Sequence, residues 1–546
     1  MDDYVCYIMQ KHSRAVTHMR EQKKLKRFGL VFGTGISRDF GFPLWEDLVK
    51  QIAEDSRVDG NQILDMPSAQ TIKSQLLFQN YRAKVLEGLP QDFDQYDRLH
   101  SRIQSGWHAI VHDALYKNIP DNIDEFKGRD KYLYEFLDII KDTRLTVNYN
   151  FDDTLQTLLN DKATNKEIEG RGFRTIWSSD IQLYPQDGVI YHPNGFLPHR
   201  PGERPSDDLI FLEGSFGDQL LESISGHYMA LSYHFSQNTC LFIGLSLDDP
   251  TLKHLLRRNA ILHPGHIHYF INFIEDGVSL DEEKRNAIRD ANFEVYNLVT
   301  LFLDRKGIAT LGQLLKYDDE KFELIADELG VSAIYKFFLT GSVCVGKSTT
   351  VSHFRSLCTH DEWLDQRAPC MEIDPSKIEK ISVIEHIDKW VADQWRAKNF
   401  KLSNEKHGIH IIDRSPLDAI AFTPKDKWID KAKYTRETIT PNLSKTSLCK
   451  GKVILMIGDA NVMSARAMKL QKDMPPEKLQ ERQDMLRTIY NSEYGGIYIV
   501  DTCNKSIQRV VKEVCRVIHI NDYFECDFQH QLQQIELGKI NPPDSH

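Results

Sequence analysis

The sequence predicts an α/β protein built from two doubly wound parallel-sheet domains, and three observations support this prediction. Apolar strand-like runs alternate with helical segments along the 546 residues. A glycine-rich turn follows a strand-like run at 33–37, and a glycine-rich loop follows another such run at 341–349. Two phosphate-cradling turns so far apart cannot serve one small site, and a chain of this length forms more than one core.

The first domain is predicted over residues 1–315. It opens with a strand at 28–32, and apolar residues with helical spacing predict a helix over 45–54. A polar and aromatic stretch at about 67–140 indicates an inserted set of helices. The further strands, separated in most cases by helical segments, are expected at 144–148, 188–191, 208–212, 240–243 and 267–273.

An acidic helical stretch that ends at Gly330 marks the boundary between the domains. The second domain is predicted over 333–520, and residues 521–546 are expected to form a polar tail without a readable function. Its buried strands are expected at 335–340, 408–412, 453–457 and 496–500.

Composition narrows the function classes. Apolar residues make up 41% and charged residues 27% of the chain, which is typical of a globular protein, and the net charge of −11 argues against nucleic acid as a partner. No run of about 18 apolar residues and no secretory pattern occurs, so a cytoplasmic protein without a membrane partner is expected. The nine cysteines include no CxxC pair and are interpreted as reduced thiols.

The first glycine turn is a candidate phosphate site, because backbone N–H groups between a strand and a helix face anions. Such a turn alone is a weak signal, but three further polar elements follow it in order, at 148–153, 191–195 and 244–250. The turn consists of Gly33, Thr34, Gly35, Ile36 and Ser37.

This ordered set resembles the sirtuin-like family, particularly the bacterial branch of NAD-degrading effectors in antiphage defence, over roughly residues 25–300. The resemblance implies a Rossmann-like domain whose glycine turn lines the phosphates of NAD⁺. It also implies that Asn150, with Asp152, holds the nicotinamide ribose and the attacking water, and that Gly244 and Ser246 meet the adenosine ribose. Cleavage of an N-glycosidic bond develops oxocarbenium character, so it needs ribose hydrogen bonds and a placed nucleophile without a metal.

The chain departs from the family at two positions. The family has His directly before a glycine after its fourth strand, where this chain has Asn194, with His192 two residues earlier. We assign His192 as the ribose-hydroxyl base, with a structural role as the alternative, and Asn194 as a cofactor-binding residue. Asn148 stands where the family has Thr; it is a further cofactor-binding candidate, and in an alternative register it replaces Asn150 as the catalytic residue.

The absence of CxxC pairs bears on the reaction. Protein-deacylating sirtuins carry a four-cysteine zinc ribbon, which this sequence cannot build. No zinc is therefore expected. Water becomes the expected acceptor, which gives hydrolysis of NAD⁺ to nicotinamide and ADP-ribose, with protein deacylation as the alternative.

The loop at 341–349 matches the pattern GxxxxGK[ST] and predicts a site for ATP and Mg²⁺. Gly341 and Gly346 allow close approach of phosphates, Lys347 meets the β- and γ-phosphates, and Ser348, followed by Thr349, ligates Mg²⁺. A helix over 350–357 is expected to follow the loop.

Residues 335–520 resemble thymidylate and deoxynucleoside kinases. Their DR[YS] element is matched by Asp413 and Arg414, which implies that the acid acts on Mg²⁺ or the acceptor and that the arginine contacts phosphate. The segment 463–472 resembles the lid of these kinases, with Arg466 closing on phosphate. Lys469 and Lys472 fit either a lid or a solvated helix.

Two further acids, Glu372 and Asp374, follow the expected second strand of this domain. The same kinases often place an acid near the acceptor sugar at this point. A solvated acidic cluster is the alternative.

The leading hypothesis is an antiphage effector that hydrolyses NAD⁺ under the control of a kinase-like sensor of nucleotides, with deoxynucleoside monophosphates as candidate ligands. A homo-oligomer and an operon- or phage-derived trigger are expected. One alternative is an active deoxynucleoside or nucleotide kinase regulated by an NAD-binding domain. Another is a pair of binding platforms within a filament or larger complex.

Overall fold

The computed structural model describes residues 2–88, 96–120, 125, 132–160, 173–178, 188–200, 203–226, 228–275, 281–364, 381–440, 447–491 and 495–543. The chain divides into two compact units. The first unit comprises residues 1–8, 22–262 and 267–318, and the second comprises 9–21, 263–266 and 319–546. The main division at 318/319 lies within the acidic helical stretch that the sequence indicates as the boundary.

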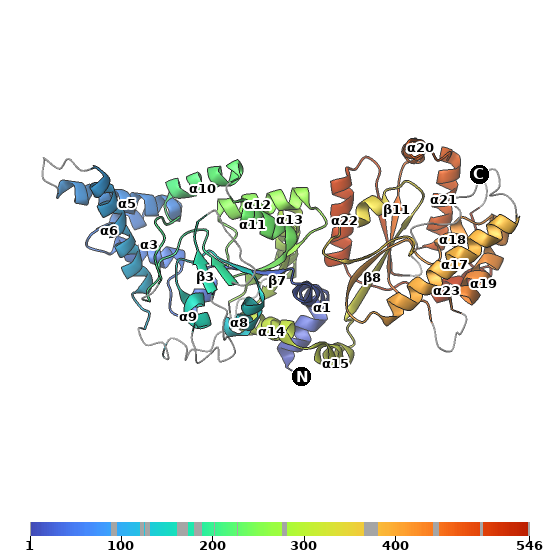
Figure 1. Ribbon diagram of the computed structural model, residues 1–546, viewed down its shortest axis with the longest axis horizontal. Helices are drawn as coiled ribbons and strands as arrows, with labels where there is room; N and C mark the ends of the chain where they lie inside the picture. The colour runs from blue at the N-terminus through green and yellow to red at the C-terminus, as the bar shows by residue number, and fades with distance from the viewer. Residues whose placement is uncertain are drawn as a thin grey trace. The chain divides into compact units, whose positions relative to one another are not determined.

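The first unit contains a seven-stranded sheet in the order β3-β4-β2-β1-β5-β6-β7, and all of its strand pairs are parallel. Helices lie on both sides of this sheet (Figure 1), which confirms the predicted α/β class. The strands are β1 (Phe28–Phe32), β2 (Leu145–Asn148), β3 (Phe173–Ile176), β4 (Gly188–Tyr191), β5 (Thr239–Ile243), β6 (His268–Phe273) and β7 (Leu298–Leu303).

The direction in which strands are added reverses at β1. Strands β2, β4 and β3 lie on one side of it, and β5, β6 and β7 lie on the other. The loops after β1 and β5 therefore flank a topological switch point, where open parallel sheets form their ligand crevices.

Thirteen helices among the described residues contribute to this unit, α1 only through residues 3–8 and 22–24, and the predicted helix over 45–54 is found as α3. They are α1 (Asp3–Lys24), α2 (Gly35–Arg38), α3 (Trp45–Ala53), α4 (Asn61–Leu64), α5 (Gln70–Glu87), α6 (Tyr96–Tyr116), α8 (Tyr134–Asp142), α9 (Thr154–Asn160), α10 (Glu213–Ser225), α11 (Met229–Gln237), α12 (Pro250–Leu262), α13 (Glu282–Tyr296) and α14 (Arg305–Lys316). Helices α5 and α6 lie within the stretch expected as a helical insertion.

The predicted strand at 208–212 is wrong. Its apolar side chains Leu209 and Phe211 are buried, but they lie in a turn, where the Phe211 ring packs 4.9 Å from the Trp45 ring. The N–H of Ile210 donates to the Asn194 carbonyl, so the backbone bonds a loop rather than a neighbouring strand. The apolar run was misleading because these side chains are buried although their backbone does not pair in the sheet.

The second unit contains a five-stranded parallel sheet in the order β12-β11-β8-β10-β9. Its strands are β8 (Ile334–Gly341), β9 (Cys358–His360), β10 (Gly408–Asp413), β11 (Lys452–Ile457) and β12 (Ile497–Asp501). Its helices are α15 (Asp319–Leu329), α16 (Lys347–Val351), α17 (Ile381–Asn404), α18 (Asp418–Ala421), the 3₁₀ helix Lys425–Lys427, α19 (Trp428–Ile439), α20 (Ala460–Lys469), α21 (Pro476–Ile489), α22 (Ile507–His519) and α23 (Phe528–Glu536).

The helix expected over 350–357 is shorter than predicted and lies earlier. Helix α16 ends at Val351, and residues 352–357 continue as turns whose N–H groups bond carbonyls three residues back in several cases. Phe354 is buried within these turns.

Helix α23 belongs to the hydrophobic core of the second unit, although its segment was expected as a polar tail. Phe528, Leu532 and Ile535 of this helix are buried in one cluster with strand residues such as Phe338 and Val453. The ring of Phe528 lies 4.9 Å from that of Phe338. The packed part of this unit therefore extends beyond residue 520.

Among the residues that the structure describes, no helix is long and apolar enough to cross a membrane.

Candidate functional site

The turns after β1 and β5 lie against one another backbone to backbone. The N–H of Gly35 donates to the Gly244 carbonyl at 2.9 Å, and a Cβ atom on Gly33 would lie 2.6 Å from that same oxygen. Gly244 has φ +72°, and a Cβ atom there would lie 2.8 Å from the Ile36 nitrogen. Only glycine fits these positions, so the motif glycines build a narrow cradle of main-chain atoms at the switch point.

Thr34, Ser246 and Asp248 are exposed in these two turns. Thr34 occupies the N-cap position of the four-residue helix α2. Ile36 and Ser37 point inward and are buried.

Asn150 connects the loop after β2 to the first glycine turn. Its side-chain amide donates to the Gly33 carbonyl and to Ser37 Oγ, both at 3.0 Å. The side chain is 2% exposed, and its Oδ1 has no hydrogen-bond partner among the described residues. A buried amide oxygen without a donor costs free energy, and a bound ligand or water molecule would relieve that cost.

Asn148 and Asn150 are also linked, since the Asn150 N–H donates to Asn148 Oδ1 at 3.2 Å. The Asn148 amide nitrogen is buried without a partner in the described part of the chain. Both asparagines that the sequence offers as alternatives therefore retain one unsatisfied polar atom.

Asp152 lies behind this pair. Burial raises its pKa from 3.8 to about 6, while hydrogen bonds from Thr154 and Ser37 act in the opposite direction. Ser37 thus joins the Asp152 carboxyl group to the Asn150 amide. Asp153, its neighbour, is instead bonded by Tyr116 and by the backbone N–H groups of residues 199 and 200.

His192 is fully buried, and both of its ring nitrogens are bonded. Nδ1 lies 2.7 Å from the Asn150 carbonyl oxygen, and Nε2 lies 2.8 Å from the side-chain nitrogen of Gln156. Because a carbonyl only accepts, Nδ1 carries the proton and Nε2 accepts from Gln156. Burial lowers the pKa of His192 to about 4, although the bond to Asn150 opposes this shift.

Among the described residues, the side-chain hydrogen bonds of Asn194 go to Gln219 and Asp249 and not to the glycine turns. It accepts from Gln219 at 3.2 Å and its amide lies 3.4 Å from Asp249 Oδ2. Asp249 in turn accepts from the Leu252 N–H at the start of α12. The structure thus connects Asn194 to the segment that follows Gly244 and Ser246.

In the second unit, the loop at 341–349 encloses the Lys347 ammonium group. Lys347 Nζ donates to the carbonyls of Gly341 and Ser342 at 3.0 and 2.9 Å, and the side chain is 6% exposed. Gly341 and Gly346 have φ values of +150° and +113°, which disfavour other residues. Burial, and then the charge of Arg414, lower the pKa of Lys347 to about 8.

Ser348 and Asp413 form an oxygen pair beside the loop. Ser348 Oγ donates to Asp413 Oδ2 at 2.7 Å, whereas the buried Asp413 Oδ1 has no partner among the described residues. Burial raises the pKa of Asp413. A hydroxyl and a carboxylate at this position are ligands that suit Mg²⁺.

Arg414 follows Asp413 in a left-handed conformation, with φ +68°. Its guanidinium donates to Glu362 at 2.6 Å and lies 3.5 Å from Asp418. Neither acid was singled out from the sequence, because nothing in a local pattern marks Glu362 as the partner of a residue 52 positions later.

A cavity of about 430 Å³ opens over this loop. Arg414 and Arg466 both line it, and Arg466 donates to the Cys344 carbonyl at 3.3 Å. Lys472 lines it as well, whereas Lys469 is exposed outside it. Lys505, which the sequence did not indicate, adds a further cation to the lining.

Lys398 is another residue that sequence reasoning missed. It is 1% exposed on α17, and its ammonium donates to the carbonyls of Asp361, Glu362 and Asp413. Burial lowers its pKa to about 8.

Glu372 and Asp374 lie outside the residues that the structure describes. Among the described residues, no group of three or more His, Cys, Asp or Glu side chains could hold a metal ion.

Residues 144–296 match the family model of a SIR2-like domain. The match spans β2 to α13 and includes Asn148, Asn150, Asp152, His192 and Gly244.

Among solved structures, the chain is similar to the NadR protein in complex with NAD and AMP-PNP, with 12% identity, a TM-score of 0.25 and coverage of 69% of this chain and 88% of that one. It is also similar to NadR in complex with NR, with 12% identity, a TM-score of 0.26 and coverage of 57% and 85%. No curated protein matches the chain.

Proposed function

We propose that the first unit hydrolyses NAD⁺ to nicotinamide and ADP-ribose. The observation that carries the proposal is the buried Asn150 amide, which is fixed to Gly33 and Ser37 through its nitrogen and retains an unpartnered oxygen among the described residues. The match of residues 144–296 to a SIR2-like domain supports the same reading.

The proposed dinucleotide site lies at the two glycine turns. A Cβ atom at Gly33, Gly35 or Gly244 would lie within 3 Å of atoms of the opposing turn, so glycine at these positions lets the two backbones meet at the switch point. We assign Gly33, Thr34, Gly35, Ile36 and Ser37 to the phosphates, and Gly244 and Ser246 to the adenosine ribose.

In the proposed reaction, the oxygen of water bonds to the anomeric carbon of the nicotinamide ribose. The carbon–nitrogen bond breaks, its electron pair stays on the nicotinamide nitrogen, and a proton from water is released to solvent. Asn150 Oδ1 accepts a hydrogen bond from the water or a ribose hydroxyl, which places the nucleophile. Asp152 holds Ser37, and we assign His192 to positioning, because its nitrogens are bonded to Asn150 and Gln156.

We further propose that the second unit binds ATP with Mg²⁺ and controls the first. Lys347 and Arg466 would meet phosphates, and Ser348 and Asp413 would hold the metal ion, whose charge neutralises phosphate oxygens when bound. A kinase-like sensor of deoxynucleoside monophosphates, acting in antiphage defence through NAD depletion in a homo-oligomer, completes the proposal. To act as a switch, the sensor ligand must bind one state more tightly by a few kcal/mol.

The decisive experiment follows nicotinamide release from NAD⁺ by the purified chain, with and without ATP and each deoxynucleoside monophosphate. We expect Asn150→Ala to abolish release under every condition. We expect Lys347→Ala to remove only the response to nucleotides. No release by the unaltered chain in any mixture would reject the proposal.

A second candidate function, phosphoryl transfer by the second unit, is favoured by one arrangement. Ser348, Asp413 and Arg414 lie together beside Lys347, with an unpartnered Asp413 Oδ1 in the described structure. In that case Lys347→Ala would abolish ADP formation from ATP and a nucleoside, and Asn150→Ala would leave it intact.

A further inference from the structure

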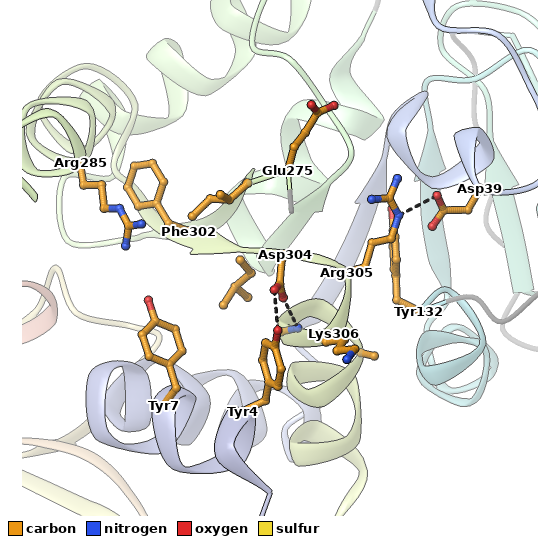
Figure 2. Close-up of a pocket in the computed structure, with 14 residues that line it drawn as sticks. Tyr4, Tyr7, Asp39, Tyr132, Glu275, Arg285, Phe302, Asp304, Arg305 and Lys306 are labelled. Atoms are coloured by element: carbon orange, nitrogen blue, oxygen red, sulfur yellow. Dashed lines mark hydrogen bonds and ion pairs between the residues drawn. The ribbon is translucent and has the colours of Figure 1, made fainter. Parts of the chain in front are cut away.

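A cavity of about 840 Å³ lies at the carboxyl ends of β6 and β7, within the first unit (Figure 2). Its walls come from Tyr4 and Tyr7 of α1, Arg285 of α13 and the segment 302–307. None of the roles proposed above uses these residues. Its volume lies within the range of small-molecule sites.

The cavity adjoins the first glycine turn. Tyr132, which lines it, donates from its hydroxyl to the Gly35 carbonyl at 3.2 Å. Asp39, directly after α2, lines it too. A ligand here would therefore lie on the same carboxyl edge of the sheet as the glycine cradle.

The acids around this cavity are already bonded. Arg305 Nε contacts Asp39 at 2.9 Å, and Arg38 contacts Glu275 at 3.0 Å. Asp304 accepts from the Tyr4 hydroxyl and from the Gly307 N–H, both at 2.7 Å (Figure 2). The acidic groups are thus matched by cations or donors within the protein.

Arg285 differs from Arg305, the other arginine of the cavity. Its guanidinium carbon lies 5.7 Å from the centre of the Phe302 ring, which holds it in place, and Figure 2 shows the side chain directed toward the cavity. Within the described residues it forms no ion pair, and its Nε is buried without a hydrogen-bond partner. Exposed Lys306 adds a second positive charge. A guanidinium with unused donors is suited to bind phosphate in a bidentate manner.

Aromatic side chains complete the lining. Tyr7 is 37% exposed, and its ring faces the cavity opposite Phe302 and Arg285 (Figure 2). Tyr4 is fixed by its bond to Asp304. An exposed tyrosine ring beside an uncompensated guanidinium suits a ligand that combines a flat ring with phosphate.

We propose that this cavity binds a ring-bearing phosphate, with Arg285 contacting the phosphate and Tyr7 the ring. Two ligands share this chemistry. It is either one end of the dinucleotide that the proposed function assigns to this unit, or a free nucleotide that acts as a separate effector. Only the first source rests on the proposed function.

Binding of ADP-ribose, measured by calorimetry, tests the proposal in the full chain. A Lys347→Ala background removes the contribution of the phosphate loop in the second unit. We expect Arg285→Ala to weaken binding about tenfold and Arg285→Lys to weaken it less, since lysine keeps the charge but not the fork.

Arg289→Ala is the matched control. Arg289 also stacks on Phe302, at 5.3 Å, but it pairs with Glu282 and does not line the cavity. Its replacement should change affinity less than twofold while altering the same ring contact. Equal losses in the Arg285 and Arg289 variants, or no binding of ADP-ribose to any variant, would overturn the proposal.

The source of the ligand is decided by competition with NAD⁺ in a chain that carries both Asn150→Ala and Lys347→Ala. Displacement of ADP-ribose by NAD⁺ assigns the cavity to the dinucleotide, and simultaneous binding assigns it to an effector. Both readouts are equilibrium binding, so a chain that fails to hydrolyse NAD⁺ would reject the proposed function while leaving the cavity testable.

Discussion

The imidazole of His192 donates from Nδ1 to the backbone carbonyl of Asn150 at 2.7 Å, so a buried ring holds the peptide from which the Asn150 side chain projects. The Gln156 amide donates to the other ring nitrogen and fixes the tautomer. A residue expected from the sequence to act on a ribose hydroxyl is therefore placed to orient the amide of the candidate catalytic residue.

Replacement of His192 should lower turnover rather than substrate binding. We expect His192→Ala to reduce kcat for NAD⁺ hydrolysis about tenfold or more with little change in KM, because Asn150 loses its backbone anchor. His192→Asn should recover part of the loss, since an asparagine amide can donate to the same carbonyl. If His192 acts as a base, the Asn and Ala variants would be equally impaired in steady-state assays.

His192 should also make the first unit sensitive to acid. Burial lowers its pKa to about 4 in the folded protein from the ordinary histidine value of 6.5, so the unfolded chain binds more protons between these values. The stability that it contributes is complete above about pH 6.5 and is lost as pH falls toward 4, by up to ~3 kcal/mol. Urea unfolding at pH 4 to 8 measures the unfolding free energy of the first unit. As pH falls, this free energy should decrease less in His192→Asn than in the unaltered chain, and an identical pH dependence in the two proteins would contradict the prediction.

The glycine cradle should not tolerate a methyl group. Gly244→Ala would place a Cβ atom 2.8 Å from the Ile36 nitrogen at φ +72°, so we expect a loss of about 2–4 kcal/mol in unfolding free energy and weaker NAD⁺ binding. Gly217→Ala is the control, because nothing lies within 4 Å of its Cβ position in α10. That change should stabilise the helix by up to about 1 kcal/mol in thermal unfolding. Equal stability of the two variants would refute the close packing.

Nucleotide binding to the second unit should be coupled to protonation of Lys347. Its pKa of about 8 means that it loses its proton as pH rises through 8, while bound phosphates would favour the charged form. We expect ATP affinity to fall above pH 8 and binding at pH 8.5 to take up a proton, as measured by calorimetry in two buffers of different ionisation enthalpy. Lys347→Met should abolish this uptake and Lys469→Ala should not; uptake in both variants would assign the proton to another group.

Helix α23 should be required for the stability of the second unit. Phe528→Ala removes a fully buried ring that packs on Phe338, so we expect a loss of about 3–5 kcal/mol in unfolding free energy. Leu537→Ala, at a site that is 67% exposed, should change stability by less than about 0.5 kcal/mol. Denaturant unfolding of the two variants measures the contrast, and similar midpoints would show that the helix does not stabilise this core.

Local sequence signals predicted much of the fold because each central strand is a short apolar run beside a turn. The edge strand β3 was missed since its four residues are only half-buried, whereas the fully buried β7 carried an apolar signal that was overlooked. The run at 208–212 misled for the opposite reason, because burial of Phe211 against Trp45 does not require a strand.

The sequence predicted only those residues of the candidate sites that belong to a local motif. Spacing located Asn150 and Lys347, but no local pattern reveals that His192 holds a carbonyl 42 residues away or that Glu362 pairs with Arg414. Lys398 was equally hidden, because a lysine on a long helix usually faces water and here it is 1% exposed. Such contacts depend on tertiary packing between strands that are distant in sequence.

The position of Phe528 in the core of the second unit affects the order in which the two units fold during translation. All seven strands of the first unit have been translated by residue 303, whereas the second core waits for a helix that ends at Glu536. At roughly 5–20 residues per second, translation of the intervening segment takes about ten to fifty seconds. During that interval the first unit can fold while the second unit is still incomplete. Nascent chains therefore pass through a stage in which only the first unit is folded.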